Sequence, residues 1–103
     1  MALKGRTPTK AEKKLMEQVA DQGCIVCRNQ GMPFVPAEIH HIYGKTKVGS
    51  HTKILPLCFA HHREGNGEEP ISRHPYKKRF VEAYGAEEDL WLQVMAYCKE
   101  DEF

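Results

Sequence analysis

Two short stretches of the sequence each carry a pair of adjacent histidines, AEIHHIY at residues 37–43 and LCFAHHRE at residues 57–64. All six histidines of the chain lie between residues 40 and 74. A neutral imidazole can hold a divalent ion, and an imidazole without an ion can accept a proton near neutral pH. Beside basic residues, such a cluster suits a divalent ion that polarises a phosphate, with one further imidazole as general base.

The cysteines indicate a second kind of site. Cys24 and Cys27 have C-x2-C spacing, and Cys58 and His61 have C-x2-H spacing, with 30 residues between the two pairs. Three thiolates and one imidazole form a closed tetrahedral zinc site; the alternative is a set of unrelated reduced cysteines. A chain this short buries a limited core, so a structural zinc ion would supply folding free energy.

Periodicity and turn signals predict the elements that position these side chains. Thr9 and Glu12 have capping-box spacing, Gly23 and Gly85 are helix stops, and Pro56 restricts its strand to an edge or a strand end. Together the elements predict an α+β fold. In chain order they are a helix at 10–22, a knuckle at 24–27, a loop at 28–36, strands at 37–43 and 52–57, a short helix at 58–64, and helices at 75–84 and 87–99.

The chain is expected to form one domain over residues 1–103, with a flexible basic tail at 1–8 and an acidic helix at 86–103. This last helix carries an apolar stripe, interpreted as core packing, and its Cys98 is interpreted as a buried small hydrophobe rather than a metal ligand. The stripe consists of Leu90, Trp91, Val94, Met95, Tyr97 and Cys98.

Charge is distributed unevenly along the chain. Residues 44–80 carry a net charge of +5, whereas residues 81–103 carry −6. The basic segment coincides with the histidines and suits a phosphate-facing surface; the alternative is an ordinary solvated face. No secretory signal and no membrane-spanning run is recognisable, so a cytoplasmic protein is expected.

The order EIHHI, a hairpin, then LPLCFAHHRE resembles the HNH, or ββα-metal, nuclease motif. More closely, the run from GCIVC through PAEIHHI, LPLCFAHH and RFVEAYG resembles the recombination enhancement function (Ref) family of phage and prophage HNH endonucleases. The combination is specific, whereas each piece alone would be weak. The resemblance implies a small zinc-stabilised ββα-metal domain with flanking helices and a metal-dependent DNA endonuclease activity linked to recombination.

The resemblance also implies roles for individual residues. His41, just before Ile42, corresponds to the general base that activates water, and His40 and His62 correspond to ligands of a catalytic ion. The ion would stabilise the leaving 3′ oxygen, so that cleavage leaves a 5′-phosphate and a 3′-hydroxyl. The C-x2-C and C-x2-H residues match the family's structural zinc set.

The chain departs from the HNH pattern near the second strand, where an Asn is expected and the sequence is SHTKILPLC. His51, Thr52 and Lys53 are the candidates for the orienting role of that Asn. Asn66 lies in the sequence GNG and is interpreted as part of a turn.

The ligand set for the catalytic ion is a second departure. Two imidazoles are few ligands for Mg²⁺, which prefers oxygen, so a third ligand is expected. His74 is the candidate; the alternative is that it only precedes the next helix. Mg²⁺ is the expected ion, and Mn²⁺, Zn²⁺ or Ni²⁺ would also suit imidazole.

DNA is the expected partner, and it would be held by the remaining basic side chains. RecA-coated DNA is a second candidate partner, because the best-known members of the group act with RecA filaments. Those members carry a longer basic N-terminal region than the tail of this chain. A phage- or prophage-encoded protein of the bacterial cytoplasm is expected. The alternative function is a non-catalytic zinc module that binds nucleic acid or protein. The expected DNA-binding residues are Lys45, Lys47, Lys53, Arg63, Lys77, Lys78 and Arg79.

Overall fold

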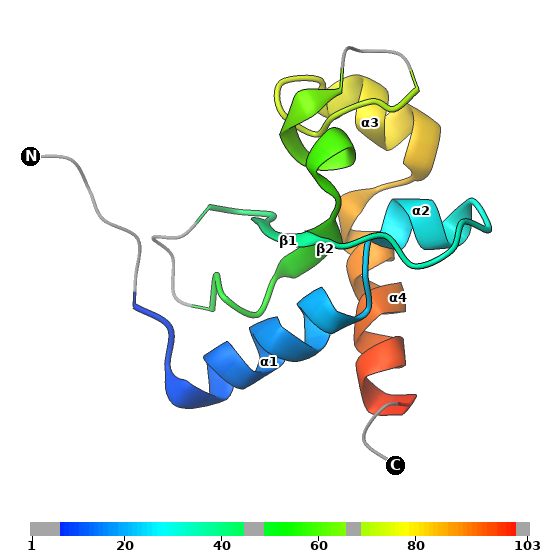
Figure 1. Cartoon of the computed structure of the whole chain (residues 1–103). Coiled ribbons are helices and arrows are strands. Elements are labelled where there is room, and N and C mark those ends of the chain that lie inside the picture. The colour runs from blue at the N-terminus through cyan, green and yellow to red at the C-terminus, as the bar shows by residue number, and fades with distance from the viewer. Residues whose placement is uncertain (1–6, 45–48, 66–68, 101–103) are drawn as a thin grey trace, which may run out of the picture.

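A two-stranded sheet surrounded by helices organises the chain, which confirms the α+β class. The computed structural model describes residues 7–44, 49–65 and 69–100. In Figure 1 the sheet lies at the centre, with α1 below it, α3 above it and α4 running down beside it. The elements are α1 (Lys10–Asp21), α2 (Ile25–Asn29), β1 (Glu38–His41), β2 (Ile54–Leu57), the π-helix η1 (Ala60–Glu64), α3 (Lys77–Tyr84) and α4 (Glu87–Glu100).

The first helix begins and ends as its sequence predicts. The backbone N–H of Glu12 donates to the Thr9 hydroxyl at 3.1 Å, and the N–H of Thr9 donates to the Glu12 carboxylate at 2.8 Å. This is a complete capping box. Gly23 follows the helix with a φ of +77°, and a Cβ at this position would lie 2.8 Å from the ring of Phe34. Only glycine satisfies both conditions.

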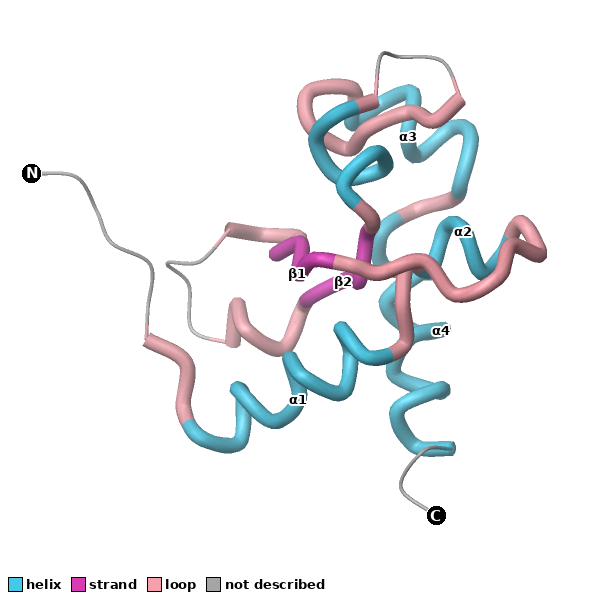
Figure 2. Tube along the Cα trace, in the orientation of Figure 1, coloured by secondary structure: helices cyan, strands magenta, loops and turns pink. Residues whose placement is uncertain are grey.

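The two strands pair antiparallel, with His40 opposite Leu55 and His41 opposite Ile54. Every residue of β2 is buried, and β2 packs against α1, α2 and α4. Both strands are shorter than predicted, because the chain turns at Ile42 directly after β1 and is still in a turn or bend at residues 52 and 53 before β2. Figure 2 shows how little of the chain is strand and how much of it is helix and loop. Pro56 pairs with Ile39 in this sheet, in which both strands are edge strands.

Two predictions for the middle of the chain are corrected. The short helix after β2 is a π-helix, and α3 begins at Lys77 instead of residue 75. The later start follows from a turn over residues 72–76. The Ser72 hydroxyl donates to the His74 carbonyl at 2.7 Å, and the Tyr76 N–H donates to the Ser72 carbonyl at 3.3 Å.

The last helix confirms the predicted apolar stripe. Leu90, Val94 and Cys98 are buried in the main core, and the other three stripe residues pack against it. Cys98 lies 3.0 Å from the Gln22 amide nitrogen and outside the group of the other three cysteines, as expected for a residue that is not a ligand. None of the helices in the described ranges is long and apolar enough to cross a membrane.

Candidate functional site

The predicted zinc residues converge at the centre of the molecule. Cys24 and Cys27 flank the first turn of α2, Cys58 follows β2, and His61 lies on η1. All four are buried, and their ligand atoms lie within 4.8 Å of one another. The Nδ1 atom of His61 faces the three sulfurs at 3.1, 3.5 and 3.7 Å.

These distances fit a zinc ion. Tetrahedral bonds of about 2.3 Å to sulfur and about 2.0 Å to nitrogen separate the ligand atoms by roughly 3.5–3.8 Å. The Sγ atoms of Cys27 and Cys58 are 3.9 Å apart. Burial raises the pKa of the Cys24 and Cys27 thiols, and neighbouring cysteines raise that of Cys27 further. A divalent ion would compensate the repulsion among thiolates, so the donor set could bind a structural metal.

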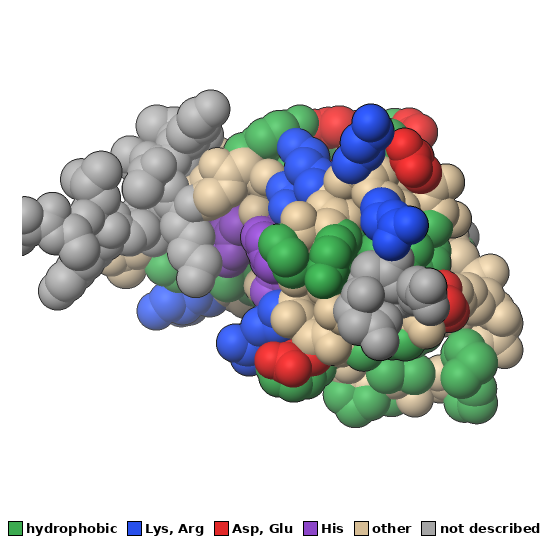
Figure 3. All heavy atoms as spheres, turned by 90° about the horizontal axis from the view of Figure 1, so that it is seen from above, with side chains coloured by type: hydrophobic (Ala, Val, Ile, Leu, Met, Phe, Trp, Pro, Cys, Tyr) green, Lys and Arg blue, Asp and Glu red, His purple; other side chains and the backbone are tan. Residues whose placement is uncertain are grey.

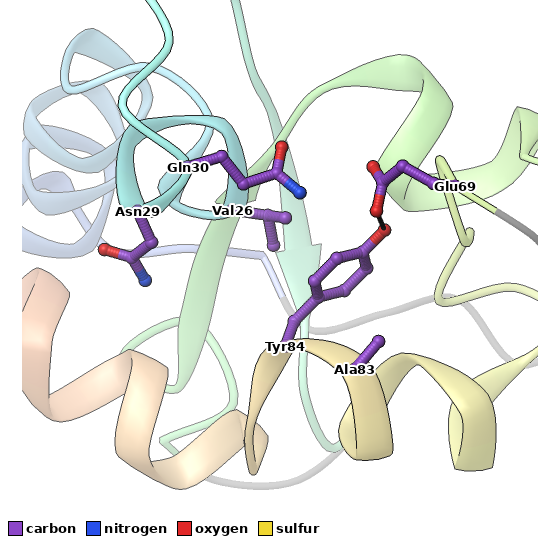
Figure 4. A pocket seen from close by; sticks show the side chains of 6 residues that line it. All are labelled: Val26, Asn29, Gln30, Glu69, Ala83 and Tyr84. Carbon is purple, nitrogen blue, oxygen red and sulfur yellow. Dashed lines mark hydrogen bonds between the residues drawn. The ribbon is translucent and has the colours of Figure 1, made fainter.

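A carboxylate and a phenol contact the histidine of this group on the side away from the cysteines. The Nε2 atom of His61 lies 3.1 Å from Glu69, and the Tyr84 hydroxyl donates to the same carboxylate at 2.5 Å. Glu69 and Tyr84 also line a surface pocket of about 290 Å³ (Figure 4). Burial and the adjacent carboxylate raise the pKa of Tyr84 to about 12, so Tyr84 remains a hydrogen-bond donor. The pair fixes which nitrogen of His61 faces the sulfurs.

A second group brings together His40, His62 and His74, with one ligand atom from each inside 4.8 Å. They come from β1, from η1 and from the segment before α3. Their ring centroids are 5.1 or 5.2 Å apart in every pair. Three convergent imidazoles are a donor set that could hold a transition-metal ion.

Local backbone geometry separates the adjacent histidines. Successive strand residues point to opposite faces, so His40 faces the interior while His41 faces the loop that carries His51. On η1, His61 points to the cysteines and His62 points to His40. The backbone N–H of His74 donates to the carbonyl of His62 at 2.9 Å, which holds the third imidazole beside η1.

Each of two imidazoles in this group is paired with a carboxylate. The Nδ1 atom of His62 lies 2.5 Å from Glu38, and the Nε2 atom of His40 lies 2.9 Å from Glu87. Burial raises the pKa of both carboxyls, but the bonds that they accept outweigh it, so the pKa values of Glu38 and Glu87 lie below the ordinary value. Both acids are therefore ionised at neutral pH.

Burial lowers the pKa of His62 and of His74, and the nearby positive groups lower both further. For His62 these effects outweigh the opposite influence of Glu38. Imidazole binds a metal ion through its neutral form. At His62 and His74 the surroundings therefore favour the neutral form that a metal ion requires.

One open cavity of about 380 Å³ gives access to the three imidazoles. His41 lines the same cavity, together with Arg73. The Nε2 atom of His41 lies 3.0 Å from Nδ1 of His51, which is buried. Among the candidates for the orienting role, His51 is the residue that contacts His41, whereas Thr52 donates to the Gly49 carbonyl.

The predicted DNA-binding residues lie in different surroundings. Lys77, Lys78 and Arg79 are exposed in the first turn of α3. Lys53 stacks on the Trp91 ring at 3.7 Å, and Arg63 forms a two-point ion pair with Glu38. Figure 3 shows Lys and Arg side chains near the histidines on the face seen from above. Lys45, Lys47 and Asn66 fall outside the described residues, as does most of the predicted N-terminal tail.

Sequence reasoning missed Glu38, Arg73 and Glu87. A signal existed for Glu38, since it lies two residues before His40 on β1 and therefore shares its face. Arg73 is adjacent to His74 and could have been considered with it. Glu87 had no local signal, because the first turn of a helix is an ordinary place for an acid.

Comparison with known families gives an independent result. The model of the family described as recombination enhancement, RecA-dependent nuclease matches residues 8–100. The match covers nearly the whole described structure, including both groups of metal-ligating side chains.

Proposed function

Because the chain belongs to the recombination enhancement, RecA-dependent nuclease family, we propose that it is a metal-dependent DNA endonuclease of the HNH, or ββα-metal, type. One observation carries the proposal: His40, His62 and His74 converge from three elements beside His41 in a single cavity. The order of two strands followed by a short helix, β1, β2 and η1, supports the proposal, since a ββα unit has this order.

In the proposed reaction, His41 accepts a proton from the water that attacks the scissile phosphorus. The new P–O bond forms in line with the bond between phosphorus and the 3′ oxygen. That bond breaks, and the 3′ oxygen takes a proton from solvent. The products carry a 5′-phosphate and a 3′-hydroxyl. A divalent ion held by the three imidazoles would stabilise the charge on the phosphate and on the leaving oxygen. His51 holds the ring of His41 in place of the Asn of the HNH pattern.

The proposed ion is a divalent metal bound by three neutral nitrogen donors. Such a set suits Mn²⁺, Ni²⁺ or Zn²⁺, and Mg²⁺ would retain several waters there. The coordination positions of the ion that the imidazoles do not fill would be available for a phosphate oxygen and water. Cys24, Cys27, Cys58 and His61 are proposed to hold a zinc ion with a structural role, since this group is closed and buried.

The proposed substrate is DNA, both bare and coated with RecA. Lys77, Lys78 and Arg79 would contact the DNA backbone, together with Lys53 and Arg63 and with Lys45 and Lys47, which lie outside the described residues. Because RecA coats DNA in the bacterial cytoplasm, we place the protein there, encoded by a phage or prophage.

The test is cleavage of duplex, single-stranded and branched DNA, each with and without a RecA filament, in Mg²⁺ and in Mn²⁺. We expect cleavage that requires the divalent ion and that is strongest with the filament. Binding to DNA without cleavage of any substrate, at full metal occupancy, would contradict the proposal and favour the non-catalytic zinc module.

A further inference from the structure

The first residue of α4 reaches into the proposed active site. The Glu87 side chain is only 6% exposed, and its Oε1 atom lies 2.9 Å from Nε2 of His40. The same oxygen accepts a hydrogen bond from Nε of Arg73, which lines the cavity. One carboxylate oxygen therefore joins a proposed metal ligand on β1 to a cation that faces the cavity.

An acid in the first turn of a helix is common, but Glu87 differs from its neighbours there. Glu88 is half-exposed and pairs with Lys53, and Asp89 is exposed to solvent. The favourable interaction of an acid with the helix dipole explains why Glu88 and Asp89 occur in this first turn. A buried carboxylate is costly unless it is paired, and here both of its partners belong to the cavity wall. Helix stability alone would not require burial.

The chemistry of imidazole connects this bond to metal binding. A neutral imidazole has one nitrogen that donates and one that accepts. When Nε2–H of His40 donates to Glu87, Nδ1 retains the lone pair that can bind an ion. Carboxylates behind ligand histidines fix the ring and raise its basicity.

We propose that Glu87 is a positioning residue for the second metal site. It holds the Nε2–H form of His40 and orients Arg73 toward a phosphate oxygen of the substrate. The proposal rests on the proposed nuclease function and assigns α4, which lies outside the ββα unit, a part in it. A carboxylate that only anchors α4 to the fold is the competing account.

The experiment compares Glu87→Ala and Glu87→Gln with wild type in protein already loaded with zinc at the cysteine site. The matched control is Asp89→Asn, an exposed acid of the same helical turn. Mn²⁺ binding is followed by electron paramagnetic resonance, and the tautomer of His40 by ¹⁵N NMR in Mn²⁺-free protein. Thermal unfolding and zinc content are measured for every variant.

We expect Mn²⁺ affinity to fall roughly 10-fold to 100-fold in Glu87→Ala. Glu87→Gln keeps an acceptor oxygen and should recover part of this loss. His40 should lose its preference for the Nε2–H form in Glu87→Ala, and Asp89→Asn should match wild type in both measurements. A change in unfolding temperature with unchanged Mn²⁺ affinity and an unchanged tautomer would overturn the proposal in favour of the anchoring account.

If Glu87→Ala does not fold, Glu87→Gln decides, because it preserves shape and one hydrogen bond. Unchanged Mn²⁺ affinity in a folded Glu87→Gln protein would then overturn the proposal, because the neutral acceptor should recover only part of the affinity. Wild-type protein that binds Mn²⁺ at the histidines but cuts no DNA contradicts the nuclease function and leaves the positioning role to be decided by these variants. Wild-type protein without a second metal site overturns both.

Discussion

Two adjacent histidines of β1 have different surroundings, and the difference defines their proposed roles. His40 is almost completely buried and contacts Glu87, His62 and His74. His41 is only partly buried and is held by His51. The alternation of a strand separates their side chains, although both residues line one cavity.

Replacing the proposed general base should separate catalysis from metal binding. We expect His41→Ala to lower the cleavage rate by a factor of about 10² to 10⁴, the usual contribution of general base catalysis. Mn²⁺ binding and zinc content should stay at wild-type values, since His41 is in neither metal group. Equal nicking rates for His41→Ala and wild type would refute the role.

The contact with His51 leads to a prediction about its replacement. His51→Ala removes the group 3.0 Å from Nε2 of His41, so the cleavage rate should fall about 10-fold or more. His51→Asn restores a polar partner of the kind that the HNH pattern uses and should retain more activity than His51→Ala. The comparison of kcat for the two variants tests the orienting role, which fails if both lose activity equally while remaining folded.

At the scale of elements, Cys24, Cys27, Cys58 and His61 join α2, the end of β2 and η1. The short helix α2 and the π-helix η1 have five residues each, and helices of this length are marginal alone. The four side chains meet where α2 and η1 pack against β2, so an ion bound there would hold both helices to the strand. Neighbouring histidines of η1 then face two different sites.

Zinc removal should therefore unfold the protein, not only inactivate it. We expect Cys27→Ser to lose the bound zinc and its cooperative unfolding transition, because structural zinc supplies much of the folding free energy in small domains. Cys98→Ser is the matched control. It alters a cysteine that is also buried but lies outside the group, so it should keep one zinc ion. Metal analysis and circular dichroism measure both effects; a Cys27→Ser variant that unfolds like wild type would contradict them.

At the scale of the whole molecule, a basic turn begins α3 and an acidic turn begins α4. The exposed basic turn of α3 follows His74 by three residues. A second exposed group, Lys10, Lys13 and Lys14, lies on α1, which is on the opposite side of the sheet in Figure 1. These two groups carry equal charge and allow a direct comparison.

We expect the triple variant Lys77→Ala, Lys78→Ala, Arg79→Ala to weaken DNA binding and to reduce the slope of log K against log salt. Each lost phosphate contact should lower the slope by about 0.9. The triple variant Lys10→Ala, Lys13→Ala, Lys14→Ala removes the same charge and should change the slope much less. Fluorescence anisotropy in the His41→Ala background measures binding without cleavage. Equal losses in both triple variants would show that net charge, and not the α3 surface, determines affinity.

The spacing of residues a few positions apart was enough to predict several features of this protein. The C-x2-C and C-x2-H pairs predicted the cysteine group, and Thr9 with Glu12 predicted the start of α1. Such spacings can be interpreted because turns and helices repeat over a few residues, so neighbours in sequence have nearly fixed relative positions. For the same reason the apolar period of α4 predicted its buried face.

Only the tertiary structure decided which side chains support the histidines. Glu87 lies 47 residues from His40 along the chain, and Glu38 lies 24 residues from His62. No local periodicity relates such positions. Their contacts arise because α4 and η1 both pack on β2, the strand that pairs with β1. The sequence by itself therefore determined the types of ligand, and the packing of helices on β2 decided their partners.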